Sequence, residues 1–120
     1  MKIENHQSDG IKITELLSES VIINTIEDGK DLLGNLYYQD SDRIIIHEKN
    51  ITPEFFDLKN GMAGEILQKF SNYRVRLAIV GDFSKYTGKS ITAFINESNK
   101  GNRIFFVPTL ARAIEMLSVK

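Results

Sequence analysis

The stretch that decides the fold is PEFFDLKNGMAGEILQKFSNYRVRLAIVGDFSKYTGKS, which runs from Pro53 to Ser90. It contains a short aromatic turn, a helical pattern flanked by glycines, an unbroken apolar run and a polar loop. This succession is typical of a helix that leads into a buried strand of a parallel sheet. Open α/β sheets bind ligands beyond the carboxyl ends of their strands, so the polar loop marks a candidate site. The pattern gives a location but no chemistry.

Similar apolar runs lie outside this stretch. Residues 44–46 and 104–107, like 75–80, are almost purely apolar, which indicates strands that are buried on both faces. Near the start, Ile3 and the alternating residues 11–14 predict two short strands joined by a turn at Ser8-Asp9-Gly10.

Helical periodicity fills the intervals between the strands. It predicts a first helix from Val21 to Tyr37 and apolar stripes within 62–70, 91–95 and 110–117. The resulting order is β-β-α-β-α-β-α-β-α. We therefore expect one α/β domain over residues 1–120, with a mostly parallel sheet of about five strands and an N-terminal antiparallel hairpin at its edge.

Composition excludes several classes of function. The 120 residues include no cysteine and two histidines, His6 and His47, and the formal net charge is -1. Disulfides, thiolate chemistry and a histidine-rich metal centre are therefore excluded, and no general basic field attracts nucleic acid or an anionic membrane. No apolar run approaches the roughly 20 residues of a membrane span, and the N-terminus has no signal-peptide core. We expect a cytoplasmic protein without metal, cofactor, nucleic acid or membrane.

Two resemblances enter at this point. The string EFFDLKNGMAGEILQKFSNYRVRLAIVGDFSKYT, followed by FINESN, resembles a bacterial family of unknown function, number four-one-eight-zero in the series of such domains. That resemblance covers most of the chain and implies a small stand-alone bacterial protein, but no activity.

The element order also resembles the STAS domain of anti-sigma-factor antagonists, which bind a partner kinase and carry a phosphorylatable serine at the helix after a central strand. The corresponding region here, Glu48 to Gly64, has no such serine. The resemblance therefore implies a regulatory fold without the phosphorylation switch, and fold alone is a weak argument for function.

Three strands of the predicted sheet end at polar or turn residues. If the sheet is parallel, Glu48, Asp82 and Pro108 share one rim with the N-termini of the following helices. Glu48 and Asp82 then form either an acid–base pair, a divalent-cation site, or two separate caps of backbone N–H groups, of which caps are the favoured reading.

Other residues near this rim have two readings each. Phe55 and Phe56 form either an aromatic lip or a core plug, and we expect one ring to be buried and the other exposed, after an N-cap at Thr52. Gly61 and Gly64 allow close approach of either a ligand or a neighbouring helix, or they remove a clash where the helix packs on the sheet, which is the favoured reading.

Two positions further along the chain have structural readings. We expect Asn72 to be the left-handed residue that ends its helix. Arg74 is expected to pair with a carboxylate at the end of the sheet opposite the rim. The loop GDFSKYTGKS lacks the glycine spacing of a phosphate-binding P-loop, but Thr87 to Ser90, at a helix start, are a candidate site for a simple anion.

Two functions follow from different classes. The favoured one is a non-catalytic binding or regulatory module that contacts a protein partner or a second copy of itself. The alternative is a small-ligand binder or enzyme that uses Glu48 and Asp82 with Tyr86 and Lys85. No catalytic residue is assigned. The candidate ligand- or partner-binding residues are Glu48, Asn50, Glu54, Phe55, Phe56, Gly61, Gly64, Asp82, Phe83, Tyr86, Thr87 and Ser90.

Overall fold

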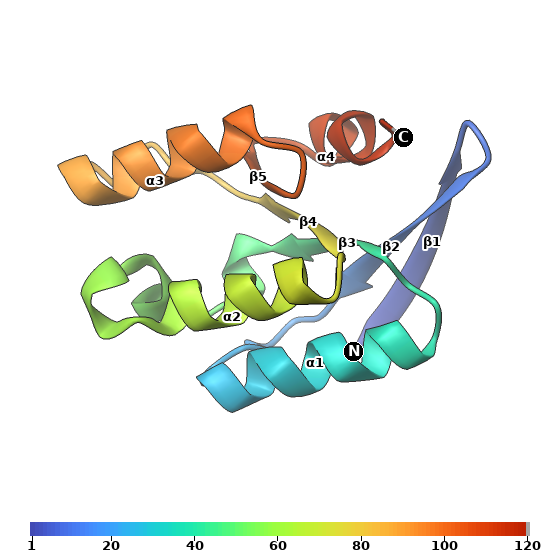
Figure 1. Cartoon of the computed structure of the whole chain (residues 1–120), viewed down its shortest axis with the longest axis horizontal. Helices are drawn as coiled ribbons and strands as arrows, with labels where there is room; N and C mark the ends of the chain where they lie inside the picture. Colours follow the sequence, from blue (N-terminus) through green and yellow to red (C-terminus); the bar gives the residue numbers. More distant parts are fainter. Residues whose placement is uncertain (120) are drawn as a thin grey trace.

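Five strands form one sheet in the spatial order β1-β2-β3-β4-β5 (Figure 1). The structure is a computed structural model that describes residues 1–119. β1 pairs antiparallel with β2, whereas the pairs β2–β3, β3–β4 and β4–β5 are parallel. The predicted mixed α/β fold and its N-terminal hairpin are therefore confirmed. The strands are β1 (Lys2–Ser8), β2 (Ile11–Leu17), β3 (Arg43–His47), β4 (Arg76–Val80) and β5 (Ile104–Val107).

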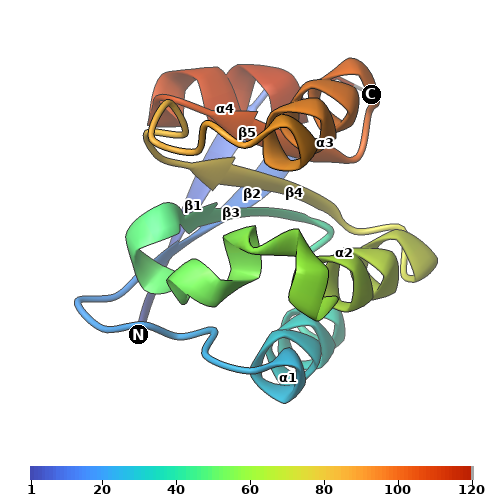
Figure 2. The ribbon, with the colours of Figure 1, turned by 90° about the vertical axis from the view of Figure 1, so that its left-hand side faces the viewer.

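Four helices complete the fold: α1 (Ile26–Tyr38), α2 (Met62–Asn72), α3 (Lys89–Lys100) and α4 (Leu110–Leu117). α1, α2 and α3 connect successive parallel strands, and their apolar side chains share one core cluster with the same face of the sheet. α4 follows β5, and its Ala113 and Leu117 pack in a second cluster with Ile13, Ile45 and Phe105. Each face of the sheet thus has its own core, and Figure 2 shows α1 and α2 on the other side of the strands from α4.

The first helix starts later than its periodicity predicts. Thr25 and Asp28 form a capping box, so α1 begins at Ile26 and not at Val21. The residues before it pair instead with the segment that follows β3, through an isolated bridge between Ile23 and Ile51. The backbone N–H groups of Ile22 and Ile23 both donate to the carbonyl of Asn50. The apolar residues here follow a helical spacing although they are not in a helix, because Ile23 is buried in the core as part of an extended segment.

A glycine does bring two helices together, but it is not the one expected. A Cβ on Gly29 of α1 would lie 2.8–3.0 Å from three side-chain atoms of Ile66 on α2. Gly64, by contrast, is exposed and a Cβ there would meet nothing within 4 Å. The prediction that Gly64 allows its helix to pack closely on the sheet is therefore wrong, and the close approach at Gly29 is between α1 and α2.

The left-handed residue after α2 is Arg74, with φ 57°, and not Asn72. Arg74 N–H donates to Ser71 O and Val75 N–H donates to Phe70 O, the two bonds of a Schellman motif. Because this motif places its left-handed residue two positions beyond the end of the helix, Asn72 stays helical. No ion pair joins Arg74 to residues 1–119, so the carboxylate partner predicted for it is not observed.

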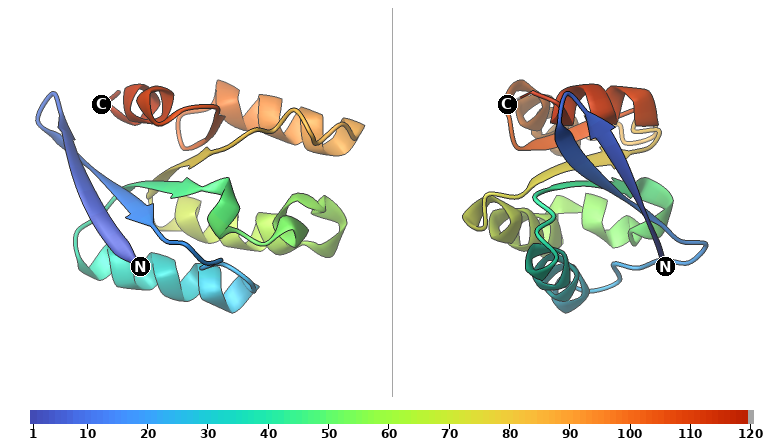
Figure 3. Two further views of the ribbon diagram at one scale, coloured as in Figure 1. Left: turned by 180° about the vertical axis from the view of Figure 1, so that it is seen from behind. Right: turned by 90° about the vertical axis from the view of Figure 1, so that its right-hand side faces the viewer.

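The N-terminal strands are seven residues long each, longer than predicted, and their hairpin reaches past the rest of the sheet (Figure 3). A hydrogen bond of 2.8 Å from Ser118 Oγ to Ser8 Oγ ties the hairpin tip to the end of α4. At the other edge, the Asn99 side chain bonds both the N–H and the carbonyl of Phe106. Over the described part of the chain, no helix is long and apolar enough to cross a membrane.

Candidate functional site

The parallel register brings three strand ends to one rim. His47, Val80 and Val107 are adjacent across β3, β4 and β5, and the chain leaves each strand immediately after them. The residues that follow are Glu48, Gly81 and Pro108. The sheet therefore has the shared edge that the sequence predicted, and the loops that carry most of the candidate residues start there.

Glu48 lies at the centre of this rim and is 9% exposed. Its Oε2 accepts a hydrogen bond of 2.5 Å from the Tyr86 hydroxyl and lies 2.8 Å from Lys85 Nζ. Gly81 makes room for this carboxylate, because a Cβ there would lie 2.5 Å from Glu48 Cβ. Burial and the adjacent carboxylate raise the pKa of Tyr86, so its hydroxyl remains a donor. Glu48, Lys85 and Tyr86, grouped together in the sequence-based alternative, do meet.

Asp82 has a different role. Its Oδ1 accepts hydrogen bonds from Ser84 Oγ at 2.6 Å and Ser84 N–H at 3.1 Å. These bonds lower the pKa of the exposed Asp82 carboxyl. Asp82 thus closes a turn, as the capping alternative predicts, and among the described residues it shares no bonding partner with Glu48.

An aromatic cluster supports the rim from below. The Phe56 ring stacks on Tyr86, with centroids 4.6 Å apart, and meets Phe83 at 5.9 Å. Phe83 in turn packs edge-on against Phe106 at 5.4 Å. Phe55 and Phe56 are 2% and 5% exposed, so the expectation that one of them forms a surface lip is wrong. Pro53 starts a short 3-10 turn, η2 (Pro53–Phe56), that directs both rings inward.

Phe83, half-buried like Tyr86, stands between two depressions that are open to solvent. Their volumes are about 390 and 410 Å³, and Phe83, Ser84 and Ile95 line both. Tyr86, Thr87, Thr92 and Asn96 complete the first depression; Gly81, Asp82, Phe106 and Pro108 complete the second.

The remaining candidate residues have structural roles or lie free on the surface. Asn50 is 1% exposed and donates to the carbonyls of Ser18 and Ser20, which fastens the chain before α1 to the rim. Gly61 adopts φ 76° at the N-cap of α2, a left-handed conformation that favours glycine. Glu54 and Ser90 are exposed, and Gly88, not a side chain, caps α3 next to Thr87.

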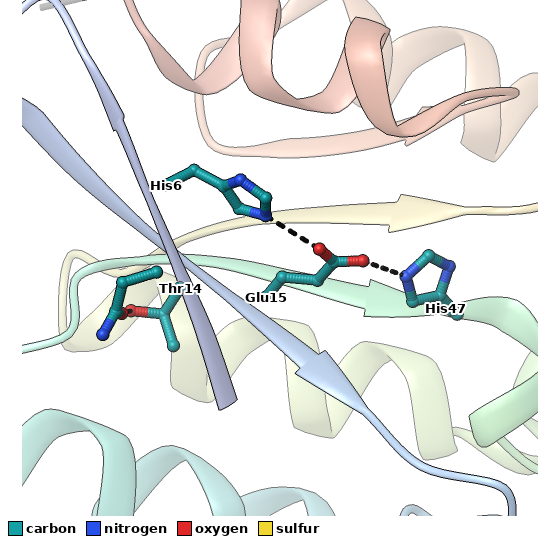
Figure 4. Close-up of polar contacts among 5 residues, drawn as sticks. His6, Thr14, Glu15 and His47 are labelled. Carbon is teal, nitrogen blue, oxygen red and sulfur yellow. Dashed lines mark hydrogen bonds and ion pairs between the residues drawn. The ribbon is translucent and has the colours of Figure 1, made fainter. Parts of the chain in front are cut away.

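Sequence reasoning missed a polar cluster on the face that α4 covers. Glu15 of β2 is 3% exposed, and its carboxylate oxygens lie 2.8 Å from His6 Nε2 and 2.6 Å from His47 Nε2 (Figure 4). Burial alone raises the pKa of Glu15, but the hydrogen bonds and charges of His47 and His6 outweigh it and the pKa falls below its ordinary value. One carboxylate thus connects the first three strands.

A signal for this cluster was present in the sequence. Glu15 is two residues after Ile13, so strand alternation places it on the same buried face. His47 stands in the same relation to Ile45. A buried glutamate needs hydrogen-bond donors. His6 and His47, which are the chain's two histidines, supply them here. Both carboxylate oxygens are hydrogen-bonded to the two rings. Within residues 1–119, no group of three His, Cys, Asp or Glu side chains is arranged so that it could hold a metal ion.

The fold and its rim define a small α/β protein with a hydrogen-bonded carboxylate, Glu48, beside a half-buried aromatic residue, Phe83. The chain belongs to the family described as Domain of unknown function (DUF4180), whose model matches residues 8–117. Neither the comparison with curated proteins nor that with solved structures yields a match.

Proposed function

We propose that the protein is a non-catalytic binding module that holds a protein partner at the rim where β3, β4 and β5 end. The observation that carries the proposal is Phe83, which stands between two open apolar depressions on a rigid aromatic base. An aromatic side chain that is held in place loses little conformational entropy on binding, and such residues dominate many protein interfaces.

We favour a binding module over an enzyme because the polar groups of the rim are engaged with each other. Glu48 accepts a hydrogen bond from Tyr86 and forms an ion pair with Lys85, and Asp82 accepts from Ser84. A general base needs a carboxylate that can reach a substrate proton, and a small-ligand site needs polar groups that converge in an enclosed pocket. The two open depressions suit the apolar side chains of a protein surface better.

The likeness to STAS domains belongs to the same proposal. It rests on the order of strands and helices along the chain and on the regulatory, partner-binding role of that class. The missing serine between Glu48 and Gly64 means that any regulation here works without phosphorylation at that position. The partner is a different protein or a second copy of this chain.

Affinity capture with matched variants tests the proposal. The wild type, Phe83→Ser and Tyr38→Ser are immobilised and exposed to a soluble extract, and retained proteins are purified and titrated directly. Tyr38 is the matched control because it is an aromatic residue, 91% exposed, on α1 and outside the rim. We expect a partner that binds the wild type and Tyr38→Ser alike and Phe83→Ser at least about tenfold more weakly. Light scattering of the purified chain tests self-association.

If no protein is retained in a way that depends on Phe83, and if the purified chain remains a monomer, docking at this rim is refuted. A Glu48→Gln variant separates the enzyme alternative, since loss of a turnover by that variant with Phe83→Ser unaffected would favour a reacting carboxylate.

A further inference from the structure

Four of the chain's five arginines meet at the edge of the sheet opposite the rim. Arg43, Arg74, Arg76 and Arg103 line one pocket of about 250 Å³ together with Asp42 and Asn102. None of the lysines and no apolar side chain takes part in that lining. The chain as a whole has a formal net charge of -1, so this concentration of arginine is local and not a consequence of general basicity.

The arrangement places like charges together at a cost. Arg43 and Arg76 are directly opposite each other on the parallel strands β3 and β4, and like charges in that relation repel. The Nη1 of each donates to a backbone carbonyl near the C-terminal end of α4. Arg43 donates to the carbonyl of Leu117, the last residue of α4, at 2.6 Å, and Arg76 donates to that of Val119, two residues later. A guanidinium has five N–H donors, so these bonds leave further donors on both side chains.

Arg74 and Arg103 are exposed and complete the ring of charge. Within residues 1–119, no Asp or Glu carboxylate forms an ion pair with any of the four arginines, including Asp42 of the same pocket. Of the described residues that line the pocket, one carries a carboxylate and four carry a guanidinium group, so the lining has an excess of positive charge.

Arg74 also occupies a backbone position that disfavours it. As the left-handed residue of the Schellman motif after α2, it stands where glycine is most common and asparagine next. The equivalent motif after α1 uses Asp40, a residue type that tolerates the conformation better. Strained residues of this kind concentrate at ligand sites, where the surrounding structure holds them in an unfavourable conformation.

We infer that this pocket binds a small, multiply charged phosphate-bearing molecule, with Arg74 and Arg103 as the main anion ligands and Arg43 and Arg76 behind them. Planar guanidinium groups bind phosphate oxygens in pairs, which explains the use of arginine and not lysine. A single pocket of this size suits a small molecule better than a nucleic acid, whose binding uses many phosphates along an extended basic surface. The site is independent of the proposed partner rim.

Calorimetric titration with pyrophosphate, and separately with inorganic phosphate, tests the inference at constant ionic strength. We expect pyrophosphate to bind the wild type with a Kd of about 1 mM or tighter. In a second series of titrations at rising salt concentration, the affinity should fall. Arg103→Gln and Arg74→Gly each lower the affinity at least about tenfold. Arg112→Gln is the matched control, because Arg112 is the fifth arginine, lies on α4 and pairs with Glu115 outside the pocket.

Arg74→Gly gives a second, independent readout. Glycine relieves the left-handed backbone, so this variant unfolds at a higher temperature than the wild type while it binds pyrophosphate more weakly. A loss of binding through misfolding is thereby excluded. The inference is overturned if pyrophosphate gives no binding heat at about 10 mM, if Arg112→Gln weakens binding as much as Arg103→Gln, or if a single-stranded oligonucleotide binds more tightly than pyrophosphate in an Arg103-dependent way.

Discussion

Replacement of Glu15 by glutamine tests the cluster that joins β1, β2 and β3. The Glu15 side chain is 4% exposed and accepts hydrogen bonds from His6 and His47. Hydrogen bonds to a charged group contribute roughly 1.5–3 kcal/mol each, whereas a neutral bond contributes about 1 kcal/mol. Glutamine keeps the volume and one acceptor oxygen, but it turns an amide NH₂ toward the other ring.

The expected loss follows from these values. Two charge-assisted bonds are replaced by one neutral bond and one repulsive contact, and the lower cost of burying a neutral side chain offsets part of the loss. We expect Glu15→Gln to lower the free energy of unfolding by about 2–4 kcal/mol at neutral pH. Urea denaturation followed by circular dichroism measures it.

The matched control is Glu4→Gln. Glu4 is directly opposite Glu15 on β1, but its side chain is exposed and forms no ion pair or side-chain hydrogen bond with residues 1–119. A surface substitution of this type changes stability by about 0.5 kcal/mol or less. If Glu15→Gln costs no more than Glu4→Gln, the carboxylate is solvated and the cluster does not form as described.

Acidic pH adds a second test of the same carboxylate. The pKa of Glu15 is below its ordinary value of 4.5 in the folded protein. A lowered pKa means that the stabilisation is fully present above pH 4.5 and is lost as the pH falls through the folded value. The difference in unfolding free energy between wild type and Glu15→Gln should therefore shrink in acid below pH 4.5. A difference that grows there would contradict the assignment.

Three glycine substitutions give further expected outcomes. Gly29→Ala places a Cβ 2.8–3.0 Å from Ile66 and should lower stability by about 1–2 kcal/mol, whereas Gly34→Ala in the same helix meets nothing within 4 Å and should raise it by up to about 1 kcal/mol. Urea unfolding of both variants checks the opposite signs, and equal signs would contradict the described packing of α1 on α2. Gly81→Ala forces Glu48 away and should lower stability by about 1–3 kcal/mol, and a neutral result in thermal unfolding would show that Glu48 does not fill that space.

Much of the architecture was predictable because its signals are local. The apolar runs at 44–46, 75–80 and 104–107 indicate buried strands wherever they stand, and helices between them force a parallel sheet. The rim follows from the same reasoning, which is why Glu48, Lys85 and Tyr86 were grouped correctly. The start of α1 was predicted too early because Ile22, which precedes the cap at Thr25, has the same helical spacing from Ile26 as the residues within the helix.

Side-chain partnerships across strands were not predictable from periodicity. Hydrophobic spacing tells which face a residue occupies, and it identified neither the partners of Glu15, which are 9 and 32 residues away, nor the burial of both Phe55 and Phe56. Asp82 and Glu48 also looked equivalent in the sequence, although one closes a turn and the other binds Tyr86.

The sequence by itself determined the order of the elements, the parallel direction of the central strands and the edge where their loops lie. These features depend on residue spacing along a short stretch of chain. Only the tertiary structure decided that His6 and His47 share Glu15, and that four arginines from two strands and two loops line one pocket. The physical reason is that such contacts depend on strand register and packing, which bring together residues that no local pattern connects.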